Sequence, residues 1–469
     1  MTVDLLVIGA GPAGMAASIA ARRHGLDVVC VDDQPAPGGQ IWRAVETVAA
    51  TARGRILGAA YQEGVAMAAA FRASGAAYLP GTQVWQIEPG FHACVTRAGQ
   101  ATSIAARTVL LATGAQERPA PLPGWTLPGW TLPGVLTVGA AQILLKTSGQ
   151  VPARPVWIVG CGPLPLLYAT QLLQAGGAIA GWLDTAPTGR FAAAFWHGRG
   201  AIAAPAALWK GLGWMTTLRR TGVRIIRGVT EVEATGQGRV EHLAWSTSAG
   251  SSGGAPADVV LVHEGVVPSI HAPLSLGCEM RWDAAQDCHV PVLNPWGETS
   301  RAGVFIAGDG AGIGGAEVAG LRGELAALGV AVQLDRLRAD AAHAAARPLR
   351  RRLRRALSVR PLLDALYRPR QAVFAPADET IVCRCEELTA GQLRTIAGTA
   401  PIGPNQLKAF SRAGMGACQG RQCGATLIRL LAAAQGRTPA EVGLLSVRPP
   451  LKPVTLGELA TLAQGLPVQ

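Results

Sequence analysis

Apolar runs alternate with glycine-rich turns and an alanine-rich stretch in the first part of the chain. Residues 3–8 are almost entirely apolar, as in a strand that is buried on both faces of a sheet. A glycine-rich turn and a helical pattern that ends near Arg23 follow, and a second apolar run begins at Asp27 and ends at Asp32. The order strand, helix, strand predicts a β-α-β unit and therefore a parallel sheet.

The turn of this unit carries glycines at the G-x-G-x-x-G spacing. Gly9 permits the tight turn, Gly11 lets the backbone approach a pyrophosphate, and Gly14 lets the helix pack on the strand. Asp32 lies 23 residues beyond Gly9, where a carboxylate can accept hydrogen bonds from an adenosine ribose. The helix begins directly behind the turn, so its N-terminal N–H groups face the phosphates. The residues predicted to contact the dinucleotide are Gly9, Gly11, Pro12, Ala13, Gly14 and Asp32.

Three further segments indicate FAD rather than free NAD. Residues 108–114 end in Ala-Thr-Gly, and residues 303–309 end in Gly-Asp. These endings resemble those of flavoproteins with two dinucleotide-binding domains, in which the Gly-Asp carboxylate meets the ribityl and pyrophosphate region. The Gly-Gly-Gln of residues 38–40 matches the stretch that lies along the pyrophosphate and the ring. The additional residues predicted to bind FAD are Gly39, Gln40, Ala112, Thr113, Gly114, Gly308 and Asp309.

A second unit of the same type begins with the apolar residues 156–160. Gly160 and Gly162 repeat the first two glycines of the motif, and Asp184 follows 24 residues beyond Gly160. Pro165 stands in place of the third glycine, and its ring fills space that glycine would leave open. Gly160, Gly162 and Asp184 therefore predict a nucleotide-type domain with three alternatives for its ligand: NAD(P), another adenine nucleotide, or none.

Four of the nine cysteines lie near the end of the chain. Cys383 and Cys385 form Cys-x-Cys, and Cys418 and Cys423 form Cys-x₄-Cys behind a glycine-rich approach. Thiolates are soft anionic ligands, and four of them in a small glycine-rich module predict a [2Fe-2S] cluster. Zinc is the alternative metal, although its sites more often use Cys-x₂₋₄-Cys pairs, and free thiols are the remaining alternative.

Composition and charge narrow the class of protein. A chain of 469 residues with 49% hydrophobic residues suggests about three globular domains. The net charge of +12 is densest between residues 347 and 370, but no helix-turn-helix, RNA-binding signature or aromatic-interleaved basic face accompanies it. We therefore expect no nucleic-acid partner. The arginine-rich segment predicts a solvated linker helix or, alternatively, a docking surface for an acidic partner subunit or a cofactor phosphate.

The sequence also limits the compartment. No apolar run reaches the length of about 18 residues that spans a bilayer, and no basic leader precedes the first strand. The five cysteines outside the C-terminal set are scattered, as in a reducing compartment. We expect a cytoplasmic protein without a transmembrane segment, either free or peripheral at the inner face of the membrane.

Several longer stretches carry a resemblance that covers essentially the whole chain. They are residues 32–41, 132–142 and 308–315, the Cys383-Arg-Cys-Glu motif, residues 414–423 and the tail Arg448-Pro-Pro-Leu. In them the sequence resembles the α, or electron-transfer, subunits of heteromeric flavin dehydrogenases, a group that includes D-hydroxyproline and proline dehydrogenases, opine oxidases and hydrogen cyanide synthase. The cysteine region resembles bacterioferritin-associated-ferredoxin-like [2Fe-2S] domains.

The resemblance implies an electron-transfer subunit that carries FAD and a [2Fe-2S] cluster. A D-amino-acid-oxidase-like flavoprotein β subunit would oxidise a C–N bond of an amino acid, imino acid or opine, of the hydroxyproline, proline, octopine/nopaline or glycine class. Electrons would reach a respiratory acceptor through the iron–sulfur centres and, in some relatives, through FMN at a subunit interface. Some relatives add a small ferredoxin-like [2Fe-2S] subunit. The sequence agrees in offering no evident catalytic base, nucleophile or triad.

The predicted fold class is α/β: a two-dinucleotide-binding-domain flavoprotein with a small helical [2Fe-2S] domain at its C-terminal end. The predicted parts are an FAD-binding domain (1–117 and 266–340), an inserted NAD(P)-like domain (118–265), an arginine-rich linker (341–378) and a [2Fe-2S]-binding domain with the tail (379–469).

Two other functions compete with electron transfer. A self-contained NAD(P)H-dependent flavin reductase of the disulfide type would be marked by a cysteine pair beside the flavin, but residues 38–43 contain no cysteine. A structural scaffold would hold its nucleotides for stability only.

Overall fold

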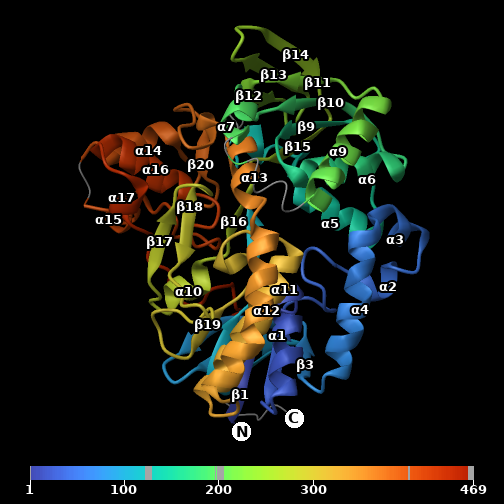
Figure 1. The fold of residues 1–469 in the computed structure, drawn as a ribbon. Coiled ribbons are helices and arrows are strands. Elements are labelled where there is room, and N and C mark those ends of the chain that lie inside the picture. Colours follow the sequence, from blue (N-terminus) through green and yellow to red (C-terminus); the bar gives the residue numbers. More distant parts are fainter. Residues whose placement is uncertain (1, 122–128, 196, 198–204, 400–401, 463–469) are drawn as a thin grey trace.

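A parallel sheet grows from the N-terminal β-α-β unit and forms the first layer of the molecule (Figure 1). The computed structural model describes residues 2–121, 129–195, 197, 205–399 and 402–462. The parallel strands lie in the order β3 (Ala77–Pro80), β2 (Val28–Asp32), β1 (Thr2–Ile8), β6 (Gln100–Leu111), and β19 (Val304–Ile306) also pairs with β6. The first half of β6 pairs antiparallel with β5 (His92–Arg97), which continues to β4 (Thr82–Glu88).

A second parallel sheet is inserted between β6 and β19. Its strands are, in order, β11 (Ile225–Arg227), β10 (Ile179–Asp184), β9 (Val156–Gly160), β15 (Val259–His263) and β8 (Val135–Thr137). An antiparallel layer of β12 (Val229–Thr235), β13 (His242–Thr247) and β14 (Ser252–Pro256) covers part of it. The chain leaves and returns through β7 (Ala115–Glu117) and β16 (Val266–Pro268), which pair antiparallel, so both crossings lie at one place.

Helices cover the two parallel sheets. The first sheet has α1 (Pro12–Arg23), α2 (Val45–Val48), α3 (Ala52–Leu57), α4 (Ala59–Ala73) and α11 (Ala316–Gln333). The second has α5 (Val138–Ser148), α6 (Pro163–Gln174), α7 (Arg190–Phe195) and α9 (Pro205–Arg220). Small residues let α1 and α11 pack closely, because a Cβ on Gly323 would lie only 2.2 Å from the carbonyl oxygen of Ala13.

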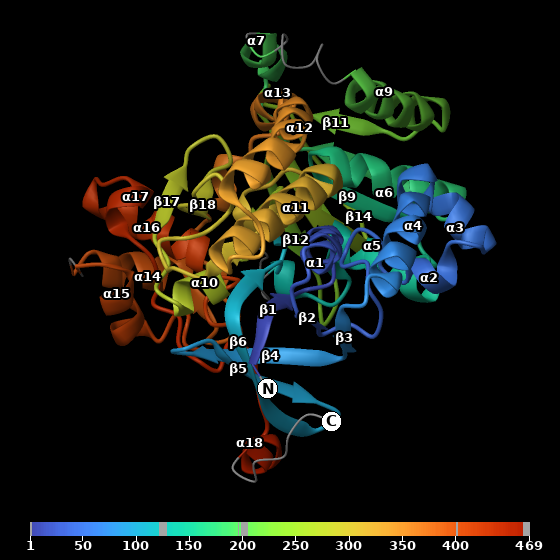
Figure 2. The same cartoon turned by 60° about the horizontal axis from the view of Figure 1, so that its bottom comes forward.

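The arginine-rich segment is helical but only partly solvated. The helix α12 (Ala339–Leu357) lies on α11 and buries Ala342 and Ala346, while Arg351 and Arg354 are exposed (Figure 2). The next helix, α13 (Arg360–Leu366), packs against α7 of the second sheet. Arg370 then becomes buried, with 6% exposure, so the expectation of a solvated linker holds for α12 but not for the end of the segment.

The C-terminal module is small and helical. Between α11 and this module lie α10 (His271–Ser275) and the hairpin of β17 (Met280–Asp283) and β18 (Cys288–Pro291). The module contains β20 (Ile381–Cys383), β21 (Leu388–Thr389), α14 (Ala390–Ala397), α15 (Pro404–Ser411), α16 (Gly424–Gln435) and α17 (Pro439–Val442). Leu393, Leu407 and Leu427 form its core. The tail returns to the first sheet, where α18 (Leu456–Leu462) contacts β6.

This arrangement confirms the predicted α/β class, with two sheets of the dinucleotide-binding type and a helical C-terminal region. The predicted helix at residues 390–397 coincides with α14, and the helix predicted from Ala425 begins one residue earlier, at Gly424. Among the described helices, none is both long and apolar enough to cross a membrane.

Candidate functional site: a dinucleotide cradle and a cysteine module

The predicted FAD residues gather at the carboxyl ends of the parallel strands of the first sheet. Gly9 and Gly14 are required by the packing, because a Cβ on Gly14 would lie 1.8 Å from the carbonyl oxygen of Gly9. Gly9 has a φ of 107°, and its own Cβ would lie 2.5 Å from the carbonyl oxygen of Ala112. Thr113 and Gly114 continue from Ala112, and the carbonyl of Gly114 accepts a hydrogen bond from the Ser269 N–H at 3.0 Å.

Gly11 and Gly39 face one another across the turn. A Cβ on Gly11 would meet nothing nearer than the Cα of Gly39, at 3.7 Å, and Gly39 has a positive φ of 57°. The N–H of Gly38 donates to the carbonyl of Ala10 at 2.8 Å and holds the two segments together. Behind them α1 begins at Pro12 and Ala13. The result is a bare backbone cradle at a helix N-terminus, which suits a pyrophosphate.

Asp32 lies at the end of β2 beside this cradle. One carboxylate oxygen accepts the N–H of Ala10 at 2.5 Å, and the other accepts the N–H of Gln34 at 2.8 Å. A carboxylate oxygen has two acceptor positions, so each can still accept a ribose hydroxyl. Burial raises the pKa of Asp32, and the two N–H donors oppose that rise.

Gly308 and Asp309 close the other side of the cradle, at the end of β19. One carboxylate oxygen of Asp309 accepts the N–H groups of Gly314 and Gly315 at 2.8 and 3.0 Å, which orders the turn that begins α11. Arg322 donates to the carbonyls of Gly308, at 3.1 Å, and of Gly312. A Cβ on Gly308 would lie 3.0 Å from the Cβ of Ala13, so both glycine-rich turns are in contact.

A buried lysine reaches the cradle from the second sheet. The Lys146 ammonium on α5 donates to the carbonyl of Gln40 at 2.9 Å and to the side-chain oxygen of Gln142 at 3.0 Å. Gln142 continues to Gln171 at 2.9 Å. Burial, reinforced by the charge of Arg43, lowers the pKa of Lys146 to about 7. No sequence motif marks Lys146, yet its charge lies next to the predicted flavin segment, where a bound phosphate or reduced flavin would compensate it.

The second dinucleotide-type unit has a different local chemistry. Gly160 is tightly enclosed, since its Cβ would lie 1.8 Å from the carbonyl oxygen of His263, and Gly162 has a φ of 123° before α6. Asp184, at the end of β10, is held by both terminal nitrogens of Arg190 at 3.1 and 2.9 Å. The acid that would receive a ribose is thus already engaged by a guanidinium from α7.

The linker reaches the same crevice. Glu264 follows β15 directly and forms an ion pair with Arg370 at 2.8 Å, and these side chains are 1% and 5% exposed. The Thr185 hydroxyl donates to Glu264 at 3.3 Å. Burial raises the pKa of Tyr367, and the nearby charges of Arg190 and Asp184 act on it. Nucleotides bind outside the carboxyl ends of parallel strands, and here linker residues lie in that region.

Replacing Glu264 by glutamine is expected to destabilise the chain by about 3 kcal/mol, because Arg370 would keep its charge in the interior without a counter-ion. Urea unfolding followed by circular dichroism measures the change. Asp340→Asn is the control: its pair with Arg338 is 70% and 86% exposed, so we expect no measurable change in stability. Equal effects of the two substitutions would show that the buried pair does not hold the linker.

The four C-terminal cysteines are arranged in two couples. Cys383 and Cys423 are buried and hydrogen-bonded to each other, whereas Cys385 is exposed and interacts with Cys418. The hydrogen bond with Cys423 lowers the pKa of Cys383 to about 6. The charges of all three other cysteines act on Cys423, whose pKa is raised.

This arrangement is a test of the predicted metal chemistry. In the described part of the chain, no three His, Cys, Asp or Glu side chains lie close enough to hold a single metal ion. Zinc in a structural site takes four ligands around one ion. A [2Fe-2S] cluster takes two ligands on each of its two irons, which is the arrangement that two thiol couples offer. Cys423 is also the N-cap of α16, whose first N–H groups favour negative charge.

The loop between Cys418 and Cys423 is hydrogen-bonded to the first crossing. The Gln116 side-chain amide donates to the carbonyl of Arg421 at 3.0 Å, and the ring Nε2 of His271 lies 3.0 Å from the carbonyl of Gln419. Gln116 lies on β7, two residues beyond Gly114 of the predicted FAD site. Neither Gln116 nor His271 has a motif that sequence reasoning could use, because the contact depends on how the module is placed.

Known proteins match this fold and its cysteine module. The family model for pyridine nucleotide-disulphide oxidoreductases, an FAD-binding fold, matches residues 3–333, and the sarcosine oxidase A3 domain matches residues 395–463. The crystal structure of L-proline dehydrogenase from P. horikoshii superposes with a TM-score of 0.69 at 18% identity, covering 98% of this chain and 79% of that chain. That likeness concerns the fold.

Curated relatives match along nearly the whole chain. A subunit of the opine oxidase of Agrobacterium tumefaciens is 43% identical over 98% of this chain and 92% of its own. The hydrogen cyanide synthase subunit HcnB of Pseudomonas aeruginosa is 29% identical over 98% and 99%, respectively. The alpha subunit of the sarcosine oxidase of Rhizobium meliloti is 25% identical over 98% of this chain but 43% of its own length. The chain therefore belongs to the pyridine nucleotide-disulphide oxidoreductase family of flavoproteins, in the group related to these opine oxidase subunits.

Proposed function

We propose that this chain is the electron-transfer subunit of a heteromeric dehydrogenase or oxidase that oxidises a C–N bond of an amino acid, imino acid or opine. The relatives at 43% and 29% identity are named as subunits, which supports an assembly with a partner that holds the substrate. In this proposal FAD occupies the cradle of the first sheet and a [2Fe-2S] cluster occupies the two cysteine couples.

One observation carries the proposal: the cysteine loop and the flavin cradle are joined by direct hydrogen bonds. Gln116 is the link, because its side chain donates to the carbonyl of Arg421 and its backbone lies two residues from Gly114. Two redox sites held on one rigid path suit transfer of electrons between them. A scaffold that only holds nucleotides would gain nothing from this placement.

The cofactor assignments follow from the donor groups. Gly11 and Gly39 leave room for a pyrophosphate, and Asp32 offers acceptors to the ribose. The cysteine couples Cys383–Cys423 and Cys385–Cys418 would each ligate one iron, and the cluster would supply one-electron transfer when bound. FMN at a subunit interface remains an expectation about the assembled complex.

The partner is proposed to be a D-amino-acid-oxidase-like flavoprotein, and a small ferredoxin-like subunit is a further candidate. Because the substrate would bind to the partner, this chain need not contain a catalytic base. The exposed arginines of α12, such as Arg351 and Arg354, offer positive charge to an acidic partner surface. The cytoplasm is the proposed compartment.

Anaerobic purification of the tagged chain from its native cell tests the proposal. We expect a second flavoprotein to co-purify, with one FAD, two irons and two sulfides for each copy of this chain. Reduction should give an electron paramagnetic resonance signal of a [2Fe-2S] cluster. Amino acids, imino acids and opines are then screened with ferricyanide as acceptor. Zinc in place of iron, or a chain that oxidises a substrate alone, would refute it.

The same preparation separates this function from an NAD(P)H-dependent reductase. Asp184 is bound by Arg190, and Glu264 holds Arg370 in the same crevice, so we propose that NAD(P)H does not reduce this flavin. Addition of NADH or NADPH should leave the flavin absorbance unchanged, whereas the partner's substrate should bleach it. Bleaching by NADH would favour the reductase.

A further inference from the structure

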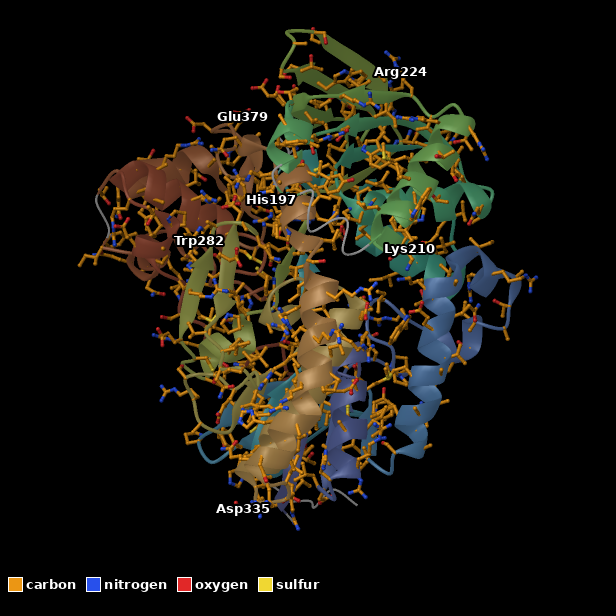
Figure 3. The ribbon with its side chains drawn as sticks, in the orientation of Figure 1. His197, Lys210, Arg224, Trp282, Asp335 and Glu379 are labelled. Carbon is orange, nitrogen blue, oxygen red and sulfur yellow. The ribbon has the colours of Figure 1, made fainter. Side chains whose placement is uncertain are left out.

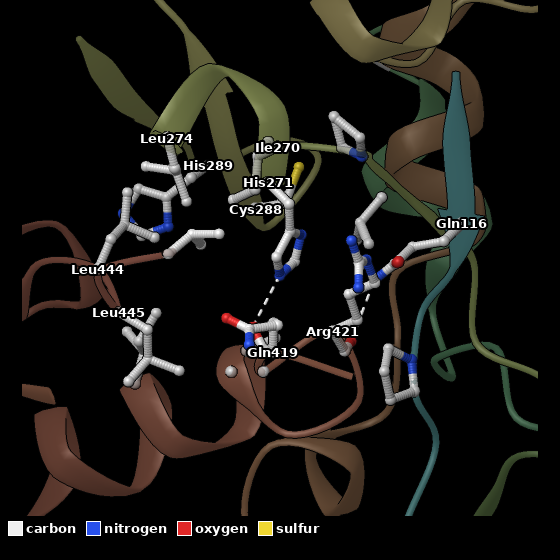
Figure 4. A pocket seen from close by; sticks show the side chains of 18 of the residues that line it. Gln116, Ile270, His271, Leu274, Cys288, His289, Gln419, Arg421, Leu444 and Leu445 are labelled. Carbon is white, nitrogen blue, oxygen red and sulfur yellow. Dashed lines mark hydrogen bonds between the residues drawn. The ribbon is translucent and has the colours of Figure 1, made fainter. Parts of the chain in front are cut away.

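A pocket separates the first crossing from the cysteine module (Figure 4). It contains about 770 Å³ of empty space, including its opening to solvent. Its walls are mostly apolar and come from both parts of the chain: Val267, Pro268 and Ile270 on one side, and Ile428, Leu444 and Leu445 on the other. Trp282 of β17 adds an aromatic side (Figure 3). None of these residues belongs to the dinucleotide cradle.

One wall of the pocket is the cysteine loop itself. Gln419, Gly420 and Arg421, which lie between two predicted cluster ligands, line it directly. His271 points toward this loop, and its Nε2 lies 3.0 Å from the carbonyl of Gln419, as Figure 4 shows. A molecule in the pocket would therefore lie against the segment that carries Cys418 and Cys423.

The polar groups of the pocket favour an uncharged ligand that has hydrogen-bonding oxygens. Burial lowers the pKa values of His271 and His289 to about 4, so both rings are neutral at physiological pH. Within the described part of the chain, the His289 ring makes no hydrogen bond, which leaves it one donor and one acceptor to offer. The carboxylate of Asp287 is already paired with Arg429.

The second guanidinium of the lining is also engaged. Arg421 donates to the carbonyls of Cys418 at 3.2 Å and Leu451 at 2.7 Å. A ligand with a phosphate would have to compete for these partners. A flat ring with carbonyl oxygens needs only apolar walls and neutral hydrogen-bonding groups, and such pockets are common ligand sites.

We propose that this pocket binds the electron acceptor as an uncharged quinone ring. The inference rests on the proposed function, because it takes the cysteine loop to be the point where electrons leave the chain. Reduction of the quinone to the hydroquinone takes up two electrons, which substrate oxidation on the partner supplies, and two protons from solvent. His289 offers a donor to a quinone oxygen and an acceptor to the hydroquinone O–H.

Filling the pocket tests the assignment. Ala425 of α16 lines the pocket and is exposed, so phenylalanine there adds a ring without displacing a core side chain. Ala434→Phe is the matched control, an exposed alanine on the same helix outside the pocket lining. The probe is 2,3-dimethoxy-5-methyl-1,4-benzoquinone, and equilibrium dialysis measures its binding to the oxidised, purified complex. This measurement needs no turnover.

We expect Ala425→Phe to weaken binding of the probe by about 10-fold or more, and to raise the KM for the probe relative to that for ferricyanide by a similar factor. His289→Phe, which keeps the ring but removes both nitrogens, should weaken binding by about 5-fold. Ala434→Phe should bind as the unmodified complex does.

Three results would overturn the assignment. They are equal probe binding by both phenylalanine variants, no binding by the unmodified complex up to about 1 mM probe, and loss of a bound flavin from Ala425→Phe alone. The last would show that the pocket holds a flavin instead. Absence of substrate-dependent ferricyanide reduction in every preparation would refute the proposed function, while the dialysis result would still decide whether the pocket binds a quinone.

Discussion

Replacing Gly11 by alanine is expected to abolish FAD binding while leaving the fold intact. The new Cβ meets no atom nearer than the Cα of Gly39, at 3.7 Å, and the φ of Gly11 is an ordinary −76°. The methyl group would therefore be tolerated by the protein but would project into the cradle proposed for the pyrophosphate. We expect the FAD affinity to fall by about 100-fold or more, or about 2.8 kcal/mol. Flavin content after gel filtration and the unfolding midpoint measure the two quantities separately.

Two other glycines provide controls for this experiment. Gly14→Ala should unfold the first sheet, because its Cβ would lie 1.8 Å from the carbonyl oxygen of Gly9. Gly213→Ala on α9 meets no atom within 4 Å and should keep both the flavin and the stability. If Gly11→Ala retains FAD with unchanged affinity, the dinucleotide does not cross this turn.

The sequence carries strong local signals for the flavin cradle. The strand at residues 3–8, the turn with Gly9 and Gly14, and the acid at Asp32 are close in sequence, and each needs a particular residue type. Steric demands of this kind are visible in one sequence, because only glycine meets them. The cysteine spacings were visible for the same reason, since thiolates are chosen for their chemistry.

The contacts that join the parts of the molecule had no such signal. Gln116 and Arg421 are 305 residues apart, and Glu264 and Arg370 are 106 apart. Glutamine, glutamate and arginine occur on every protein surface, so their burial depends on how the domains pack rather than on spacing. The arginine-rich segment looked solvated for that reason, and Lys146 passed unnoticed in an ordinary amphipathic helix.

The second nucleotide-type unit shows the limit of motif reasoning most clearly. Gly160, Gly162 and Asp184 keep the spacing of a ribose-binding unit, and the fold around them follows it. Arg190 nevertheless takes the carboxylate of Asp184, and the linker reaches the crevice from more than a hundred residues away. A fold can outlast the ligand for which its turn is suited, so the site and not the motif must decide the ligand.

Replacing Cys423 by serine is expected to stop electron transfer beyond the flavins. Cys423 is fully buried and hydrogen-bonded to Cys383, so the smaller hydroxyl fits the same space. An alcohol oxygen is a hard, weakly acidic donor and a poor substitute for a thiolate on iron. Iron content and the electron paramagnetic resonance signal should fall to background, and the rate of acceptor reduction should fall by about 100-fold or more, about 2.7 kcal/mol in transition-state stabilisation.

The step that precedes the cysteine module gives this last experiment its discrimination. Substrate should still bleach the partner's flavin at the normal rate in Cys423→Ser, because that step does not involve the cysteines. Cys278→Ser is the control: this buried cysteine contacts Thr299 at 3.4 Å, outside the C-terminal couples, and its loss should leave the iron content unchanged. An unfolding midpoint equal to that of Cys278→Ser would exclude a general loss of structure. Full acceptor reduction by Cys423→Ser would mean that electrons bypass the cysteine couples, and the proposed path through the C-terminal module would then be wrong.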